Sequence, residues 1–176
     1  ALDRRVDRLE EFRKRLGDWW PLAEPIRLRA IDGQLVPSPP WWKCGGGAWG
    51  ILRSNLRIIE ECLMDGVRSV LILEDDAIPC SDFTFRVGRF LAAVPADWEQ
   101  IYLGGQHLFE KQHPPRRIND DVVIPYNINR CHAYGLSASG MKMSYKHLTA
   151  INWQPKHHID HRYGVLHQAR GIKVYA

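Results

Sequence analysis

The sequence predicts one α/β domain spanning residues 1–176, with helices layered on a mostly parallel central sheet. Three observations predict it. Candidate helices and strands alternate along the chain, which is typical of βα units. Residues 70–73 read Val-Leu-Ile-Leu without polar alternation, as in a strand that is covered on both faces. A chain of 176 residues can also bury one full core without disulfides or a structural metal.

The predicted helices have apolar residues at three- and four-residue steps. In the first helix, Val6, Leu9 and Phe12 follow this spacing among charged residues. The second helix ends at Asp65-Gly66, a good C-terminal signal. The predicted helices are residues 3–16, 48–64, 83–94 and 139–151.

The predicted strands are short apolar runs bounded by Gly, Pro or polar residues. They are residues 26–31, 70–73, 100–103, 122–124, 132–137 and 172–175. Residues 37–47 and 107–121 are expected to be loops. The first of these loops, rich in Pro and Gly, is a candidate mobile loop beside a site.

Composition excludes several classes of protein. A net charge of +4 and a pI near 9.0 favour an anionic ligand without demanding nucleic acid. No apolar stretch reaches the roughly 18 residues of a membrane span, and the first residues do not have the pattern of a signal peptide. The four cysteines contain no Cys-x-x-Cys pair, which argues against a zinc knuckle or a thioredoxin-like site. We therefore expect a cytoplasmic protein with reduced thiols.

The strand at residues 70–73 ends in three carboxylates, Glu74, Asp75 and Asp76. Open α/β sheets place ligands at the carboxyl ends of their strands. Carboxylates there suit Mn²⁺ or Mg²⁺ holding the phosphates of a substrate. The other interpretation is an acidic loop that follows a core strand.

Several segments, taken in order, resemble the motifs of glycosyltransferase family 25, which includes lipooligosaccharide and collagen galactosyltransferases. They are residues 2–9, 30–33, 47–55, 71–76, 101–105, the run His132-Ala133-Tyr134, Gly140 and Asp160. Asn55 departs from the pattern, because the family has a histidine there. The family's first strand would precede Leu2, and relatives continue past Ala176, so we expect a chain that is trimmed at both ends.

The resemblance implies a GT-A-like (Rossmann-like) α/β/α fold and an inverting, metal-dependent transfer of galactose or glucose from a UDP-sugar. The acceptor would be a hydroxyl of a glycan, a protein or a modified nucleobase. The implied donor-binding residues are Arg5, Arg8, Asp32, Gly33, Glu74, Asp75, Gly104 and Gly105.

Within the acidic run, the outer pair sits at i and i+2, so both side chains of an extended segment point the same way. Asp76 is thus the expected metal ligand, and Glu74 faces the metal or the donor ribose. Asp75 either caps the helix region at Phe83 or pairs with a basic residue.

Other residues have plainer alternatives. Arg5 and Arg8 lie three apart on one helical face and suit phosphate, or they form a solvated basic face. Asp32 binds the nucleotide or is simply a turn residue. Ser54 and Asn55 favour packing or capping over ligand binding.

The second candidate cluster is the histidine-rich run at residues 157–161. Asp160 is the expected base for the acceptor hydroxyl, and a helix N-cap is its alternative. The His-x-Asp spacing also occurs at the iron of 2-oxoglutarate oxygenases, but residues 161–176 leave little room for their distant second histidine. Whether His161 or His167 completes a metal shell stays open.

A second hypothesis is a non-catalytic nucleotide- or glycan-binding domain of the same fold. Asn55 and the missing first strand favour it. The intact acidic run favours the enzyme, because a scaffold needs no acids at that strand end.

Overall fold

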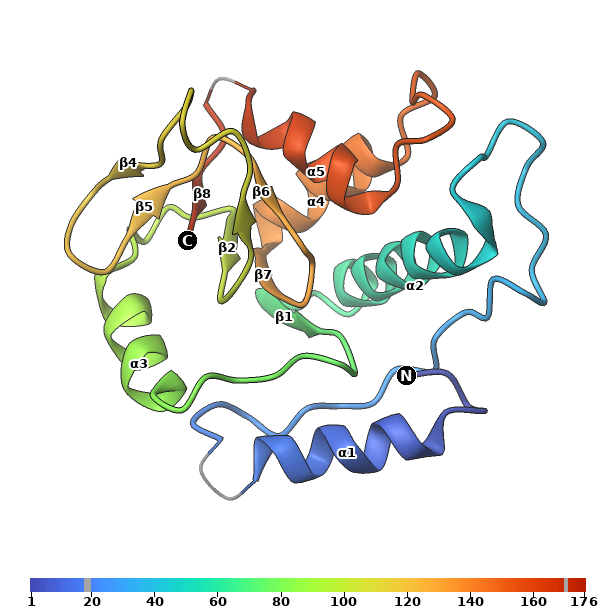
Figure 1. Cartoon of the computed structure of the whole chain (residues 1–176), viewed down its shortest axis with the longest axis horizontal. Coiled ribbons are helices and arrows are strands. Elements are labelled where there is room, and N and C mark those ends of the chain that lie inside the picture. Colours follow the sequence, from blue (N-terminus) through green and yellow to red (C-terminus); the bar gives the residue numbers. More distant parts are fainter. Residues whose placement is uncertain (18–19, 170) are drawn as a thin grey trace.

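The computed structural model describes residues 1–17, 20–169 and 171–176, and within them the chain is a mixed α/β protein (Figure 1). Its helices are α1 (Val6–Leu16), α2 (Gly45–Met64), α3 (Phe83–Ala93), α4 (Ala138–Leu148) and α5 (Ile159–His167). Its strands are β1 (Ser69–Leu73), β2 (Gln100–Tyr102), β3 (Gln106–His107), β4 (Arg116–Arg117), β5 (Val123–Ile124), β6 (Ile128–Asn129), β7 (Ala133–Ser137) and β8 (Val174–Tyr175).

Four strands form the central sheet in the order β1-β7-β2-β8. β7 pairs antiparallel with both β1 and β2, whereas β2 pairs with β8 in parallel. The prediction of a mostly parallel sheet is therefore wrong for the described pairs. The prediction failed because β7 is inserted between β1 and β2 and is antiparallel to both. The order of elements along the chain does not reveal such an insertion. β1, β2 and β8 still share one direction, so their carboxyl ends lie at the same edge.

Neighbouring residues of the sheet face two different cores, because side chains alternate across a strand. Ile101 packs in a cluster with Phe90 of α3. Tyr102, the next residue, belongs to a larger cluster with Ile59 of α2 and Met141 of α4. Helices α2, α4 and α5 thus cover one face of the sheet, and α3 covers the other.

A hydrogen bond between buried polar side chains joins α2 to the centre of the sheet. The hydroxyl of Tyr134, which is fully buried in β7, donates to Asn55 Oδ1 at 2.6 Å. Asn55 in turn donates to the Ile51 carbonyl at 2.9 Å. The Ser54 hydroxyl accepts from the backbone N–H of Ile31 at 2.8 Å. Ser54 and Asn55 are therefore packing residues that hold α2 against its neighbours.

The four predicted helices are confirmed as α1 to α4, with ends shifted by a few residues. The strand expected at residues 26–31 is not formed, although the whole segment is described. Ile26 is 96% exposed there, and Ala30 donates its backbone N–H to the Ala1 carbonyl instead of to a sheet. Helix α5 was not predicted.

No helix in the described part of the chain is long and apolar enough to cross a membrane. All four cysteines carry free thiols.

His167 of α5 sits in a buried polar network. Its Nδ1 accepts the backbone N–H of Ile128 at 3.3 Å, and its Nε2 lies 3.2 Å from Gln100 Oε1 and 3.4 Å from the Tyr102 hydroxyl. Burial lowers the pKa of His167 to about 3, and the charge of His147 adds to this effect. The folded protein therefore holds His167 neutral.

This neutral histidine makes stability depend on pH. The ordinary pKa of histidine is 6.5, and that of folded His167 is about 3. Between these two pH values His167 is protonated in the unfolded chain and neutral in the folded protein. The contribution of His167 to the free energy of unfolding is therefore fully present above pH 6.5. It falls as the pH is lowered through this window, by about 2 kcal/mol at pH 5. Urea unfolding of His167→Gln should lack this loss, while the exposed control His113→Gln keeps it. An unchanged pH slope in His167→Gln would contradict the assignment.

Candidate functional site

The acidic run leaves the sheet directly at the end of β1. Glu74 donates its backbone N–H to the His132 carbonyl at 2.9 Å, one position beyond the last β1–β7 pair, Leu73 with Ala133. Ala77 then donates to the Glu74 carbonyl at 3.1 Å and closes a turn. The turn begins immediately after the ladder, so the carboxylates collect at the strand end as the sequence predicts.

His132 meets two of these carboxylates. Its Nδ1 lies 3.0 Å from Glu74 Oε2 and 4.0 Å from Asp76 Oδ1. One ligand atom from each of the three residues lies within 4.8 Å of the others. We name Glu74, Asp76 and His132 the acid–histidine cluster. The sequence did not predict His132 as a metal ligand; it appeared only in the motif His132-Ala133-Tyr134. Its position beside Glu74 depends on the pairing of β1 with β7.

Negative charge is concentrated around Glu74. Burial raises the pKa of Glu74; the hydrogen bond with His132 acts against this, and the charges of Asp76 and Asp160 add to it. Burial also raises the pKa of the Cys131 thiol far above its usual value, with the charge of Asp160 as the next cause. Asp160 therefore joins the acid–histidine cluster electrostatically, although it lies on a distant part of the chain.

Asp160 occupies the first turn of α5, where a carboxylate suits the positive end of the helix dipole. The N-cap residue is His158, so the N-cap interpretation of Asp160 is wrong. His158 Nδ1 lies 3.8 Å from Asp160 Oδ2. The side chain of Asp160 is 20% exposed, so it remains accessible to a ligand.

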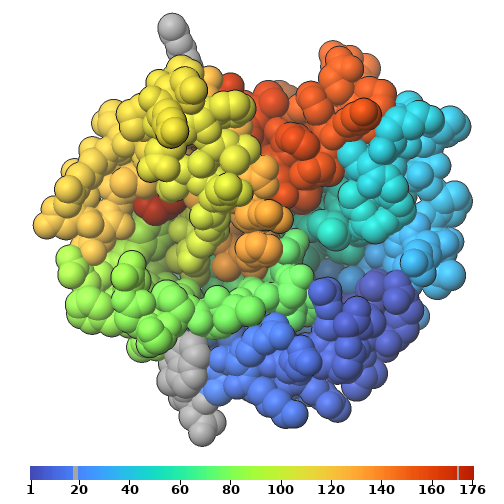
Figure 2. All heavy atoms as spheres, in the orientation of Figure 1, coloured from blue at the N-terminus to red at the C-terminus, as the bar shows by residue number. Residues whose placement is uncertain are grey.

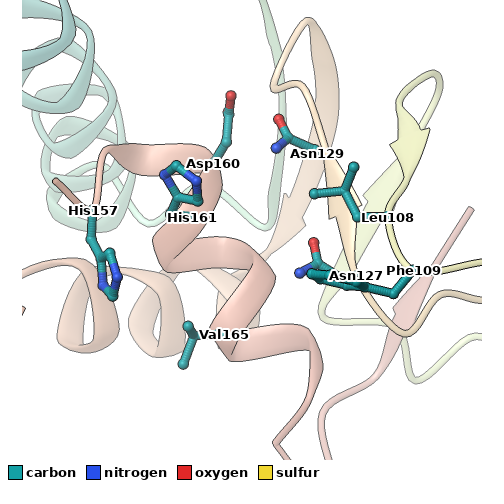
Figure 3. A pocket seen from close by; sticks show the side chains of 8 residues that line it. All are labelled: Leu108, Phe109, Asn127, Asn129, His157, Asp160, His161 and Val165. Atoms are coloured by element: carbon teal, nitrogen blue, oxygen red, sulfur yellow. The ribbon is translucent and has the colours of Figure 1, made fainter. Parts of the chain in front are cut away.

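Asp160 also lines a hollow of about 180 Å³, which we name the α5 hollow. In Figure 3, Asp160 and His161 project from the first turns of α5, and Asn127 and Asn129 come from the neighbouring segment around β6. The other lining residues are Leu108, Phe109, His157 and Val165. The hollow combines an apolar wall with amide, imidazole and carboxylate groups, as ligand sites commonly do.

Arg8 ties α1 to the acidic run. Its Nη1 lies 3.0 Å from Asp75 Oδ1, and its Nη2 lies 3.3 Å from Asp76 Oδ2. In Figure 2 the blue N-terminal region abuts the green segment around β1. Asp75 thus pairs with a basic residue, which was one of its two expected roles. Arg5, in contrast, directs its hydrogen bonds to Asp7.

The other expected donor-binding residues make structural contacts. Asp32 accepts from Arg4 Nε at 2.7 Å and from the Gln34 backbone N–H at 3.0 Å, as a turn residue does. A Cβ on Gly33 would lie 1.7 Å from the carbonyl oxygen of Gly46 in α2. Gly33 therefore permits a close approach between a loop and a helix.

Gly104 and Gly105 lie between β2 and β3. A Cβ on Gly105 would meet Ile128 of β6 at 2.7 Å, whereas Gly104 has open space around it. Gly105 thus allows β6 to pack closely, and the structure brings neither glycine into the acid–histidine cluster.

Comparison with known protein families, curated proteins and solved structures found no match to the chain. The resemblance described above therefore depends on the sequence motifs alone. The features of the structure that bear on function are the acid–histidine cluster, Asp160 and the α5 hollow.

The packing role of Gly33 can be tested by stability. Gly33→Ala should destabilise the fold by roughly 1–3 kcal/mol, because the added methyl overlaps backbone atoms of α2. Gly47→Ala is the matched control, since its Cβ meets nothing within 4 Å and alanine favours the helix by about 0.5–1 kcal/mol. Thermal and urea unfolding measure both. Unchanged stability in Gly33→Ala would return Gly33 to the list of ligand-binding candidates.

Proposed function

We propose that this chain is a metal-dependent, inverting glycosyltransferase with a GT-A-like fold. It moves a hexose, galactose or glucose, from a UDP-sugar to a hydroxyl acceptor. The observation that carries the proposal is the acid–histidine cluster at the end of β1, with Asp160 and the α5 hollow beside it. The shared direction of β1, β2 and β8 and the motif resemblance support the fold assignment.

The donor set of the acid–histidine cluster fits a divalent cation. Glu74 and Asp76 offer hard carboxylate oxygens, which suit Mg²⁺ and Mn²⁺, and His132 offers a nitrogen, which suits transition metals. Together they favour Mn²⁺ over Mg²⁺. Three protein ligands leave coordination positions for the oxygens of a diphosphate. A bound cation would also balance the carboxylates that crowd Glu74.

In the proposed reaction, a bound cation would neutralise the charge that develops on the departing UDP. The hydroxyl oxygen of the acceptor attacks the anomeric carbon on the face opposite the nucleotide. The bond between that carbon and the diphosphate oxygen breaks, and UDP leaves with the bonding electrons. The carboxylate of Asp160 takes the hydroxyl proton, because it lines the α5 hollow and its charge acts on Glu74 of the acid–histidine cluster.

Arg8 has a supporting role. Its guanidinium already holds Asp75 and Asp76 in place, and it lies close enough to the cluster to meet the donor phosphates. Arg5, paired with Asp7, contributes less. The non-catalytic alternative keeps the same contacts but predicts nucleotide binding without transfer.

The metal assignment predicts the behaviour of two variants. Asp76→Asn and His132→Ala should each weaken Mn²⁺ binding by roughly tenfold or more, because each removes one of three ligands. Titration calorimetry with MnCl₂ measures this directly. The control is Asp82→Asn, an acid paired with Arg86 on α3. Equal Mn²⁺ affinity in all of these proteins would refute the metal site.

The base assignment makes a separate prediction. Asp160→Asn should abolish hexose transfer while UDP and Mn²⁺ binding persist, because the base acts only on a bound acceptor. The stability cost should stay within about 1 kcal/mol, since asparagine keeps the shape of the side chain and only the helix-dipole interaction and the 3.8 Å contact with His158 are weakened. The readouts are UDP release from UDP-galactose and UDP-glucose and calorimetric binding. Transfer within a few-fold of the parent would make Asp160 structural. Binding without transfer in the parent itself would favour the non-catalytic domain.

A further inference from the structure

A second hollow adjoins the α5 hollow. It has a volume of about 350 Å³ and is lined by Phe109, Gln112, His113, Tyr126 and Gln168. We name it the Tyr126 hollow. Phe109 lines both hollows and therefore stands between them.

The sizes of the hollows limit what each can hold. At about 180 Å³, the α5 hollow falls below the roughly 300–1,000 Å³ of sites for drug-sized ligands. It slightly exceeds the cavity of about 150 Å³ that accepts benzene in a well-studied protein. The α5 hollow therefore has room for one six-membered ring, and the Tyr126 hollow, which shares Phe109 with it, offers space for a second.

The Tyr126 hollow contains an aromatic platform. The rings of His113 and Tyr126 stack with centroids 4.0 Å apart and an interplanar angle of 20°. The Tyr126 hydroxyl donates to Gln168 Oε1 at 3.2 Å, which fixes the ring beside an amide. A flat ring bordered by amides matches a sugar, whose C–H face packs on the ring while its hydroxyls bond to the amides.

The backbone of Phe109 is strained where the two hollows meet. Its φ is 60°, a left-handed conformation that is rare for a bulky side chain. The backbone N–H groups of Gln112 and His113 both donate to the Phe109 carbonyl, at 3.0 and 2.7 Å, and hold this turn. The turn leaves the Phe109 side chain 56% exposed between the hollows. Strained residues of this kind cluster at ligand sites.

We propose that the two hollows bind the last two sugar residues of an oligosaccharide acceptor. The terminal residue lies beside Asp160 in the α5 hollow, and the next residue packs against the stacked pair of His113 and Tyr126, with Phe109 between the two sugars. This inference rests on the proposed function and selects a glycan over a protein or a nucleobase as the acceptor. A single amino-acid side chain or base would use the α5 hollow and leave the aromatic platform without a ligand.

The test compares disaccharides with monosaccharides in direct binding, without donor or metal. Saturation-transfer NMR and calorimetry would use lactose, maltose and N,N′-diacetylchitobiose with their methyl monosaccharides. At least one disaccharide should bind about three- to tenfold tighter than its monosaccharide, the gain expected from one aromatic contact. Tyr126→Ala should remove this gain, whereas Tyr126→Phe, which keeps the ring, should retain most of it. The exposed aromatic Phe85, on α3, gives the control Phe85→Ala.

Three outcomes would overturn the inference: equal affinity for both sizes of sugar, a gain that survives Tyr126→Ala, or no binding by any member of the panel. Thermal unfolding of each variant separates loss of binding from loss of fold. UDP release from UDP-galactose and UDP-glucose by the parent protein, with Mn²⁺ and each sugar of the panel as acceptor, tests the proposed function independently. Disaccharide binding without UDP release would leave the two sugar sites standing and reject the transferase. UDP release without tighter binding of any disaccharide would support the transferase and reject the two sugar sites.

Discussion

The antiparallel register of β7 on β1 is the constraint on which the rest of the site depends. Pairing Leu73 with Ala133 makes Glu74 and His132 the next opposed residues, and a hydrogen bond of 2.9 Å joins their backbones. A slip of one residue would turn every side chain of β7 to the other face of the sheet. Tyr134 opposes such a slip, because its ring is fully buried and its hydroxyl is bound to Asn55 of α2. The packing of the core therefore fixes the geometry of the acid–histidine cluster.

Two helices bring further charges to that strand end, and they do so from opposite ends of the chain. Arg8 on α1 balances Asp75 and Asp76, whereas Asp160 on α5 adds negative charge near Glu74. The resulting excess of carboxylates is unfavourable by itself, since burial already raises the pKa of Glu74. A divalent cation would relieve it, and this electrostatic need is the physical reason to connect the cluster with a bound metal.

Much of this arrangement could be predicted from the sequence, and the failures have physical causes. The apolar run of β1 and its carboxylates are local features, as is the periodicity of α1 to α4. The position of β7 between β1 and β2, and with it the role of His132, depends on contacts between distant segments. Helix α5 lacks a clear apolar stripe because its buried face includes Arg162 and His167, which are hydrogen-bonded there through Arg162 Nε and His167 Nδ1. Residues 26–31 alternate like a strand, but no sheet edge pairs with them in the described structure.

The central proposal is that the register of β7 on β1 places Glu74, Asp76 and His132 to bind a divalent cation, and that this cation also binds a diphosphate. Paramagnetic broadening by Mn²⁺ in NMR spectra of the isotope-labelled protein tests it most directly. The claim predicts that amide signals of residues 74–76 and 131–133 broaden first, at low Mn²⁺, and that added UDP lowers the Mn²⁺ concentration required. Broadening that begins at another acidic surface, such as Asp120 and Asp121, or that is indifferent to UDP, would contradict it.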